Sequence, residues 1–277
     1  MKSIYVVIFI ILTCIFIILT CIFISIMWLA TLFNSDDKSF DIVIPIGPND
    51  SEIISLQLEY TRKNIIGYRN IYLICSDDTL KIDGCITISE NIFPFSLNTV
   101  SEHLGKSKRN GWYLQQLLKL YAGLIIPGIL DKYLVIDADT FFLKPTIFYE
   151  NNKSIYNFSE ENHLPYFEHI KKLNPNLRKM HSNKSGISHH MMFETRSIKE
   201  MFNMIEQEHN DIFYTIFLKN VTEKDGSGAS EYELYFNYML LKHPREITIR
   251  KLKFKNADKL IIDSNDYDYI SYHYYLR

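Results

Sequence analysis

The sequence predicts an α/β domain, built on a mostly parallel sheet with helices on both faces and preceded by one transmembrane helix. Three observations support this fold class. An apolar run without charged residues fills residues 4–33. Patterns typical of a strand, a helix and a second strand follow one another between residues 40 and 75. A further buried-strand pattern, at residues 132–136, ends on acidic residues. A strand–helix–strand unit implies parallel strands with the helix packed on the sheet.

The N-terminal apolar run is long enough to cross a membrane. About 20 apolar residues span the hydrocarbon core. The apolar part of a cleaved signal peptide has roughly 7–15 residues and ends at a cleavage site of small residues. Residues 26–29, which read Ile-Met-Trp-Leu, offer no such site. We therefore expect residues 1–33 to be an uncleaved transmembrane anchor and residues 34–277 to form one globular domain.

The residues that flank the run predict its orientation. Lys2 and the α-amino group precede it, and the net negative segment 36–38 follows. The positive-inside rule then favours a type II single-pass protein with a lumenal or exoplasmic domain. In such a compartment Cys75 and Cys85 could pair, with a buried thiol as the alternative for Cys75. Asn-x-Ser/Thr acceptor sequences, compatible with this location, begin at Asn49, Asn152, Asn157, Asn183 and Asn220.

The charge of the chain excludes one class of partner. There are 30 basic and 32 acidic residues, for a formal net charge of −2. A nucleic-acid-binding protein needs a stripe of basic side chains to neutralise phosphates, and the sequence has none. We interpret the short basic cluster at residues 106–109 as a solvated loop, and we expect no nucleic-acid partner.

Hydrophobic periodicity predicts the elements of the domain in order. The predicted strands are residues 40–46, 70–75, 132–136, 189–193 and 267–277, and the predicted helices are residues 51–64, 111–126, one from 197 and one from 231 to before Pro244. Pro127 and Gly128 stop the second helix. The polar, Asn-rich residues 151–188 are expected to form loops and short helices. No internal repeat or long linker divides the domain.

Two acidic residues, Asp137 and Asp139, follow directly on the buried strand at residues 132–136. Open α/β sheets bind ligands at the carboxyl ends of their strands. Residues two apart in an extended segment point the same way, so both carboxylates can approach one divalent cation. Mn²⁺ or Mg²⁺ suits oxygen ligands that substrate phosphates complete. The sequence therefore predicts a metal site at this edge, where the cation would neutralise a leaving diphosphate.

Several segments together resemble a GT-A-type nucleotide-sugar glycosyltransferase. They are Asp41–Pro45, Leu134–Phe142 with its Asp-x-Asp motif, and a late histidine, His273; the helix Gly111–Leu120 is similar to that of a poorly characterised branch of these enzymes. The resemblance covers roughly residues 40–273. It implies a nucleotide-diphospho-sugar donor, a glycan or glycoprotein acceptor, a Rossmann-like GT-A fold and a metal at the Asp-x-Asp motif.

The resemblance also implies roles for individual residues. His273 would be a further metal ligand beside Asp137 and Asp139, and its alternative is an ordinary histidine in an aromatic C-terminal strand. Lys119 lies on the polar side of its helix, where it contacts either the donor or solvent. The expected donor-binding residues are Pro45, Lys119, Asp137, Ala138 and Asp139.

Two glutamates at the start of the last predicted helix receive different interpretations. Ser230 and Glu233 fit a Ser-x-x-Glu capping box, which gives Glu233 a structural explanation. Glu231 follows a Gly-rich loop and is placed to face the ligand edge of the sheet. We expect Glu231 to act as a general base on the acceptor hydroxyl or to hold sugar hydroxyls. The alternative is a glutamate favoured only by the helix dipole.

His189 and His190 are adjacent in a predicted strand, so their side chains point in opposite directions and do not share a metal. We expect one of them, His190, to face the acceptor as a catalytic residue and the other to be structural.

Two other functions compete with sugar transfer. A haloacid-dehalogenase-like phosphatase also has a strand followed by Asp-x-Asp, with Thr or Val two positions after the second Asp. Here that position is Phe141, Thr140 comes one place early, and the acidic pair at residues 77–78 lies upstream of the motif, whereas the phosphatase has a later one. The second competitor is a non-catalytic, membrane-anchored binding domain of the same fold.

Overall fold

The computed structural model describes Thr13 and residues 18–21, 40–77, 79–261 and 265–276. The chain divides into two compact units, Met1–Lys38 and Ser39–Arg277. The predicted anchor at residues 1–33 lies almost entirely outside the described residues. Within the described part of the chain, no helix has the length and apolar character needed to span a bilayer.

The second unit is built on a five-stranded sheet with the strand order β10-β5-β1-β3-β4. Four strands are parallel, and β10 pairs antiparallel with β5. The central strand is buried along its whole length, which explains why it reads as an apolar run without alternation. The strands are β1 (Phe40–Pro45), β3 (Tyr68–Cys75), β4 (Ile86–Ser89), β5 (Lys132–Ile136) and β10 (His190–Glu194).

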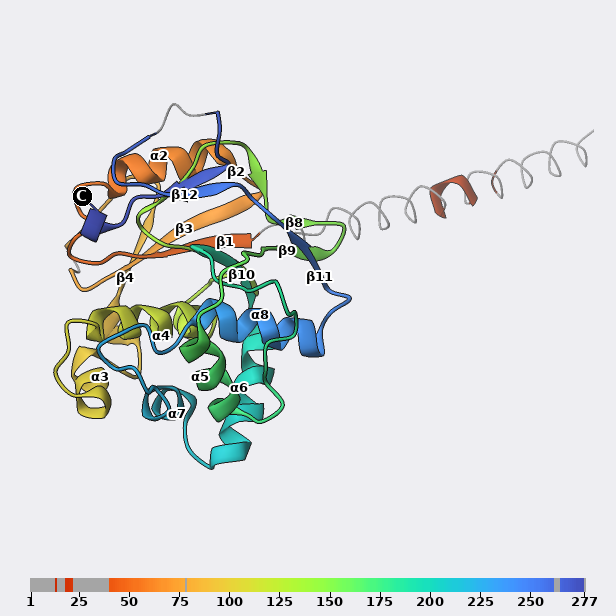
Figure 1. Ribbon diagram of the computed structural model, residues 1–277. Helices are drawn as coiled ribbons and strands as arrows, with labels where there is room; N and C mark the ends of the chain where they lie inside the picture. The colour runs from red at the N-terminus through yellow and green to blue at the C-terminus, as the bar shows by residue number, and fades with distance from the viewer. Residues whose placement is uncertain (1–12, 14–17, 22–39, 78, 262–264, 277) are drawn as a thin grey trace, which may run out of the picture. The chain divides into compact units, whose positions relative to one another are not determined.

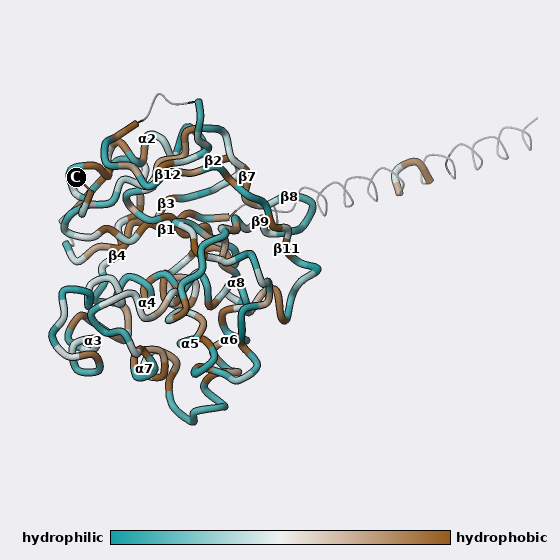
Figure 2. Tube along the Cα trace, viewed as in Figure 1, coloured by the Kyte–Doolittle hydropathy of each residue, from teal (hydrophilic) through white to brown (hydrophobic). Residues whose placement is uncertain are grey.

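Helices cover the two faces of this sheet unequally (Figure 1). On one face α4 packs against β1, β5 and β10, and α8 packs against β10. The remaining helices of this layer surround those two, whereas α2 lies on the other face beside a small sheet (Figure 1). The helices are α2 (Ile54–Asn64), α3 (Leu97–Leu104), α4 (Asn110–Ile125), α5 (Leu164–Leu173), α6 (Thr195–His209), α7 (Phe213–Lys219) and α8 (Glu231–Lys242). Hydrophobic segments follow the central strands, and hydrophilic loops surround them (Figure 2).

Three smaller sheets complete the unit. The sheet β12-β13-β6 joins β6, which directly follows the acidic residues after β5, to the C-terminal part of the chain. The others are β11-β9-β8 and the pair β2-β7. Their strands are β2 (Ile65–Ile66), β6 (Thr140–Phe142), β7 (Thr146–Ile147), β8 (Tyr149–Glu150), β9 (Lys153–Asn157), β11 (Ile247–Arg250), β12 (Phe254–Asn256) and β13 (Tyr269–Ser271); two 3₁₀ turns are η2 (Glu90–Ile92) and η3 (Tyr274–Leu276).

The order of the strands determines where a ligand is expected. From β1 the chain moves outward to β3 and β4, and then returns to β5 on the other side of β1. Strand order therefore reverses between β1 and β5. In open α/β sheets such a switch point leaves a crevice at the carboxyl ends of the strands, where ligands bind. Here that edge carries the residues after β5, beginning at Asp137.

The mixed α/β architecture with a mostly parallel sheet agrees with the predicted fold class. The polar stretch at residues 151–188 holds a strand, β9, as well as the expected helix. Cys75 and Cys85 are not joined to each other by a disulfide. Cys75 is buried at the end of β3, and the sulfur of Cys85 accepts a hydrogen bond from Arg62 at 3.2 Å.

Candidate active site

The residues Asp137–Asp139 form the turn between β5 and β6, and the neighbouring strand braces that turn. The N–H of Asp137 donates to the carbonyl of His189 at 2.9 Å, and the N–H of Thr140 donates to the carbonyl of Asp137 at 2.9 Å. Both acidic side chains are largely buried, with exposures of 20% for Asp137 and 15% for Asp139. The turn therefore holds both carboxylates at the ligand edge of the sheet.

Asp139 lies beside His273 because of the pairing between β6 and β13. Thr140 is opposite Ser271 in this antiparallel ladder, and the N–H of Tyr272 donates to the carbonyl of Asp139 at 2.8 Å. The next side chain, His273, brings its Nδ1 to 2.8 Å from Asp139 Oδ2. Ser271 Oγ donates to the other carboxylate oxygen at 3.1 Å. Burial would raise the pKa of Asp139, but the hydrogen bond and charge of His273, together with His189 and Ser271, outweigh burial and lower it.

Lys119 links the other acidic residue to helix α8. Its Nζ lies 2.5 Å from Asp137 Oδ1 and 2.6 Å from Glu231 Oε1, and only 3% of its side chain is exposed. Tyr232 places its ring 4.5 Å from the ammonium group, and its hydroxyl donates to Asp137 at 2.8 Å. Burial alone would lower the pKa of Lys119, but the carboxylates of Asp137 and Glu231 raise it. Lys119 is thus an internal counter-ion, which rules out the solvent-exposed alternative, while its contact with the donor stays a prediction.

Glu231 lies in the first turn of α8 and is 3% exposed. Its N–H donates to Gln116 Oε1 at 3.1 Å, which fixes the start of α8 against α4. Burial raises the pKa of the Glu231 carboxyl, and the ion pair with Lys119 opposes that shift. The structure therefore places Glu231 one side chain away from Asp137, joined to it through Lys119.

Glu233 forms only half of the predicted capping box. Its N–H donates to Ser230 Oγ at 3.2 Å. Its carboxylate, however, accepts from the N–H of Gly186 at 2.7 Å and from Asn237 Nδ2 at 2.6 Å. The expectation that Glu233 only caps its helix is therefore corrected, because the side chain holds a loop from another part of the chain.

The two adjacent histidines exchange the roles expected for them. His190 is 1% exposed and packs on the rings of Phe142, Phe148 and Tyr269. Neither of its ring nitrogens has a hydrogen-bond partner among the described residues. His190 is therefore a core residue, and the prediction that it is catalytic is corrected. Alternation along a strand predicts that the side chains of His189 and His190 point in opposite directions. Only the pairing of β10 with β5 decides which of the two side chains faces the site.

His189 is the histidine at the site. The centre of its ring lies 5.2 Å from that of His273, and its carbonyl accepts the N–H of Asp137. Burial lowers the pKa of His189 to about 4, although Asp137 opposes the shift. The imidazole is therefore neutral at pH 7, and it lines the side of the site formed by β10.

The donor set fits a divalent cation in part. Asp139 and His273 offer a carboxylate and an imidazole at one point, and both suit Mn²⁺. Asp137 instead directs one oxygen at Lys119 and Tyr232. In the described part of the chain, no group of three or more His, Cys, Asp or Glu side chains is arranged to hold a metal ion. A cation here would thus have Asp139 and His273 as its protein ligands, with substrate oxygens as the others.

Two further predicted donor-binding residues are part of the packed core around the site. Pro45 ends β1 and is buried, and Ala138 is 2% exposed between the two acidic residues. Both lie at the switch point between β1 and β5. Their side chains support the site from within and present little surface to a ligand.

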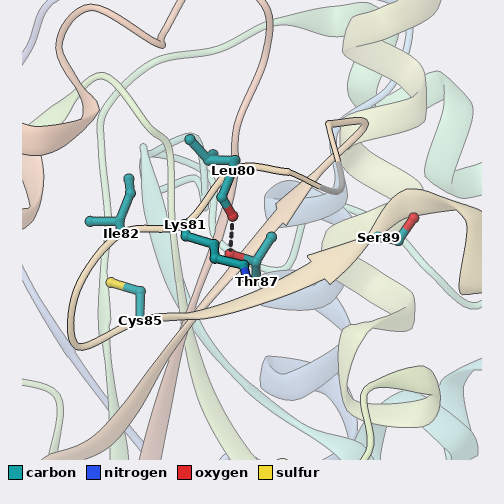
Figure 3. Close-up of a pocket in the computed structure, with 6 residues that line it drawn as sticks. All are labelled: Leu80, Lys81, Ile82, Cys85, Thr87 and Ser89. Carbon is teal, nitrogen blue, oxygen red and sulfur yellow. Dashed lines mark hydrogen bonds between the residues drawn. The ribbon is translucent and has the colours of Figure 1, made fainter.

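A hollow of about 450 Å³ lies elsewhere, beside β4 (Figure 3). Thr87 Oγ1 donates to the carbonyl of Leu80 across it at 2.7 Å. None of the six described residues that line it is Asp, Glu or His. Those residues are Leu80, Lys81, Ile82, Cys85, Thr87 and Ser89.

Comparisons with known proteins place the chain in context. A protein-family model described as "Family of unknown function (DUF6492)" matches residues 68–267. No curated protein matches at a significant level. Among solved structures, the crystal structure of mouse xyloside xylosyltransferase 1 in its apo form is similar to this chain, with 10% sequence identity and a TM-score of 0.43. The similarity covers 84% of this chain and 97% of that chain.

Proposed function

The chain belongs to this family of unknown function, and we propose that it is a metal-dependent glycosyltransferase that moves a sugar from a nucleotide-diphospho-sugar to a glycan or glycoprotein. One observation carries the proposal: a carboxylate–imidazole pair, Asp139 and His273, lies beside a buried charged cluster at the point where strand order reverses. Such an edge is where α/β sheets bind nucleotides and phosphates. The resemblance of the Asp-x-Asp segment to GT-A enzymes supports the same conclusion.

Asp139 and His273 would hold Mn²⁺ or Mg²⁺ together with the donor diphosphate. The cation supplies Lewis-acid stabilisation of the charge that develops on the leaving diphosphate. Ser271 orients the Asp139 carboxylate through its hydrogen bond. Asp137 keeps one oxygen on Lys119 and Tyr232, so its other oxygen can accept from the ligand. The protein thereby binds the diphosphate end of the donor between β5 and β13.

Glu231 would act on the acceptor. The ammonium group of Lys119 favours the ionised form of this buried carboxylate, which is the form that accepts a proton. Partial desolvation makes the carboxylate a stronger base than one in water, because burial raises its pKa. The N-terminal turn of α8 thus supplies the base, and Lys119 joins the base to the donor side of the site through Asp137.

We further propose that residues 1–33 anchor the protein in a membrane with its domain on the lumenal or exoplasmic side. The uncharged length of residues 4–33 and the flanking charges support this topology. An anchored enzyme would meet acceptors close to the bilayer, such as membrane glycoproteins or glycolipid-linked glycans.

A screen of nucleotide sugars tests the function. Full-length protein is mixed with each donor, with and without Mn²⁺, and both thermal stabilisation and release of the nucleoside diphosphate are measured. We expect one donor to stabilise the protein more in the presence of Mn²⁺ and to be turned over. Stabilisation without any turnover, even with mixed glycan acceptors, would instead identify a non-catalytic binding domain. No response to any nucleotide sugar would refute both.

The Glu231→Gln variant then tests the base. It keeps the volume of the side chain and removes its basicity, so sugar transfer should fall by roughly 10²-fold. Binding of the donor should change little. Glu223→Gln, in the loop before α8, is the matched control and should keep its activity. Equal activity of the Glu231→Gln variant and the unmodified protein would move the base elsewhere, with His189 as the next candidate.

A further inference from the structure

A buried pair of side chains on α8 holds the segment of residues 178–188 in place. Glu233 is fully buried, and Asn237, one turn later on the helix, is 1% exposed. Asn237 Oδ1 accepts the N–H of Met180 at 2.7 Å, and Glu233 Oε2 accepts the N–H of Gly186 at 2.7 Å. The two side chains also bond to each other, at 2.6 Å. We call these two residues and their bonds to the segment the α8 latch.

The pattern of donors and acceptors determines which side chains fit the α8 latch. A backbone N–H can only donate, so Met180 fixes the Asn237 amide with its oxygen toward the segment. The amide nitrogen of Asn237 then donates to Glu233 Oε1 and to the carbonyl of Glu233, at 2.8 Å. Gly186 donates to the other carboxylate oxygen. Both oxygens of Glu233 therefore face donors, which only a carboxylate satisfies.

The segment lies directly on α8 at the latch. A Cβ atom added to Gly186 would lie 2.4 Å from Phe236 Cβ and 2.9 Å from the carbonyl of Tyr232. No side chain fits in that space without a shift of the helix or of the segment. On its other side, Ser185 pairs with Ser159 through backbone hydrogen bonds of 2.9 and 3.0 Å. The segment is thus clamped immediately before it enters β10.

Three residues beyond Gly186, the segment delivers His189 to the site. The carbonyl of His189 accepts the N–H of Asp137, and its ring lies beside that of His273. We propose that Glu233 and Asn237 are positioning residues, which act through Gly186 and His189 to hold Asp137 in place for the transfer reaction. The inference rests on the proposed function. Helix α8 then serves the site twice, with Glu231 in it and Glu233 behind it.

The Glu233→Gln variant tests the α8 latch because it introduces one donor where an acceptor is needed. Rotation of the Asn237 amide only moves the mismatch to the N–H of Met180. We expect kcat to fall about tenfold, since small displacements of catalytic groups cost one to two orders of magnitude in rate. The donor KM should change less than threefold, because Asp139 precedes β6 and His273 follows β13, both outside the segment.

A second substitution should restore part of the loss. In the Glu233→Gln/Asn237→Asp variant the amide and the carboxylate exchange places, so both backbone donors and the bond between the side chains are satisfied again. We expect at least a threefold recovery of kcat over Glu233→Gln alone. The matched control is Glu194→Gln. That residue is a buried glutamate at the other end of β10 that accepts from Ser154 Oγ at 2.8 Å, and we expect wild-type kcat.

Hydrogen exchange gives a readout that does not depend on activity. Loss of the α8 latch should speed exchange of the Asp137 amide proton, which the carbonyl of His189 holds, by about tenfold. An unchanged exchange rate, or a Glu233→Gln variant with lower melting temperature and wild-type kcat, would overturn the inference. An inactive wild-type protein would refute the proposed function alone, because the exchange comparison would still decide the role of the latch.

Discussion

Two edges of the same sheet, the end of β5 and the flank of β4, differ in almost every respect that matters for chemistry. The flank of β4 has open space but is lined by uncharged side chains and one lysine (Figure 3). The end of β5 brings together Lys119, Asp137, Asp139 and Glu231, all of them mostly buried. The contrast teaches that converging charges, and not the size of a hollow, distinguish the edge that we propose as the functional one.

Topology explains the difference. β5 lies between β1 and β10, and its end is also joined to β6 and β13, so five segments converge there. β4 is the last strand in the order of the sheet. Where several segments converge, charged side chains that are far apart in sequence can form ion pairs. A strand at the border of the sheet supplies mainly its own residues to the surface beside it.

The largest expected effect is at the acidic turn. Asp139→Asn or Asp137→Asn should lower sugar transfer by at least roughly 10³-fold, because the phosphate charge loses its compensation. Steady-state assays over a range of Mn²⁺ concentrations measure it. Asp211→Asn, an exposed aspartate paired with Lys219, should stay within twofold. Unchanged activity and Mn²⁺ dependence in Asp139→Asn would contradict the assignment of the charged edge.

The buried counter-ion should dominate stability. Lys119→Met leaves Asp137 and Glu231 facing each other without a cation, which should cost about 3–5 kcal/mol in the free energy of unfolding. Urea titration measures this loss. Lys144→Met breaks a partly exposed pair with Asp268 and should cost about 1 kcal/mol or less. Similar losses of stability in the two variants would contradict the deep burial of Lys119 and its ion pairs.

The carboxyl of Glu233 should make stability depend on pH. Burial raises its pKa from 4.5 to about 7. The unfolded state releases its proton at a lower pH than the folded state, so ionisation of this buried carboxyl lowers the stability as pH rises from about 4.5 through about 7. The hydrogen bonds that Asn237 and Gly186 donate to the ionised carboxylate offset part of this loss. The loss should reach at most about 3 kcal/mol. Unfolding measured at several pH values should show a flatter slope for Glu233→Gln, and an identical slope would contradict this pKa.

A smaller effect is expected at His273. His273→Ala removes one of the two ligands that meet at the end of β13, so the Mn²⁺ concentration for half-maximal activity should rise roughly tenfold. Circular dichroism should show a folded domain. His181→Ala, in the segment before β10, provides the comparison. A wild-type Mn²⁺ requirement in the His273→Ala variant would remove this residue from the metal site.

The smallest effect is expected on the flank of β4. Thr87→Val removes the hydrogen bond to Leu80 and should cost about 1 kcal/mol in stability, with sugar transfer within twofold of wild type. Thermal unfolding and the transfer assay measure the two quantities. A strong loss of transfer at unchanged donor affinity would show that the hollow contributes to the reaction, and would reverse the contrast between the two edges.

Local patterns predict the elements of this fold better than their pairings. The strand at residues 132–136 has the predicted bounds, and the helix predicted at residues 111–126 occupies Asn110–Ile125. Strong apolar periodicity determines both. The strands β6, β12 and β13 have three residues each, too few to show a hydrophobic period. β9 lies in a polar stretch without such a period, and its strand conformation depends on pairing with β11.

The acidic pair and the late histidine could be selected from the sequence, but their partners could not. In the sequence, Lys119 looks like a surface residue. Its carboxylate partners, Asp137 and Glu231, are 18 and 112 positions away, so the ion pairs appear only once α4 is packed against α8. The same limit applies to His189 and His190. Alternation separates the two side chains, and only the neighbouring strands decide which one faces the charged edge.

The pairing of β6 with β13 has a consequence for how the protein is made. Synthesis proceeds from the N-terminus, and domains fold as their chain emerges. Asp139 meets His273 only after 134 further residues have been added, whereas the strands β1, β3 and β5 are complete long before. The nascent chain can therefore form most of its sheet before Asp139 and His273 can meet, so the proposed metal site forms only after β13 has been synthesised.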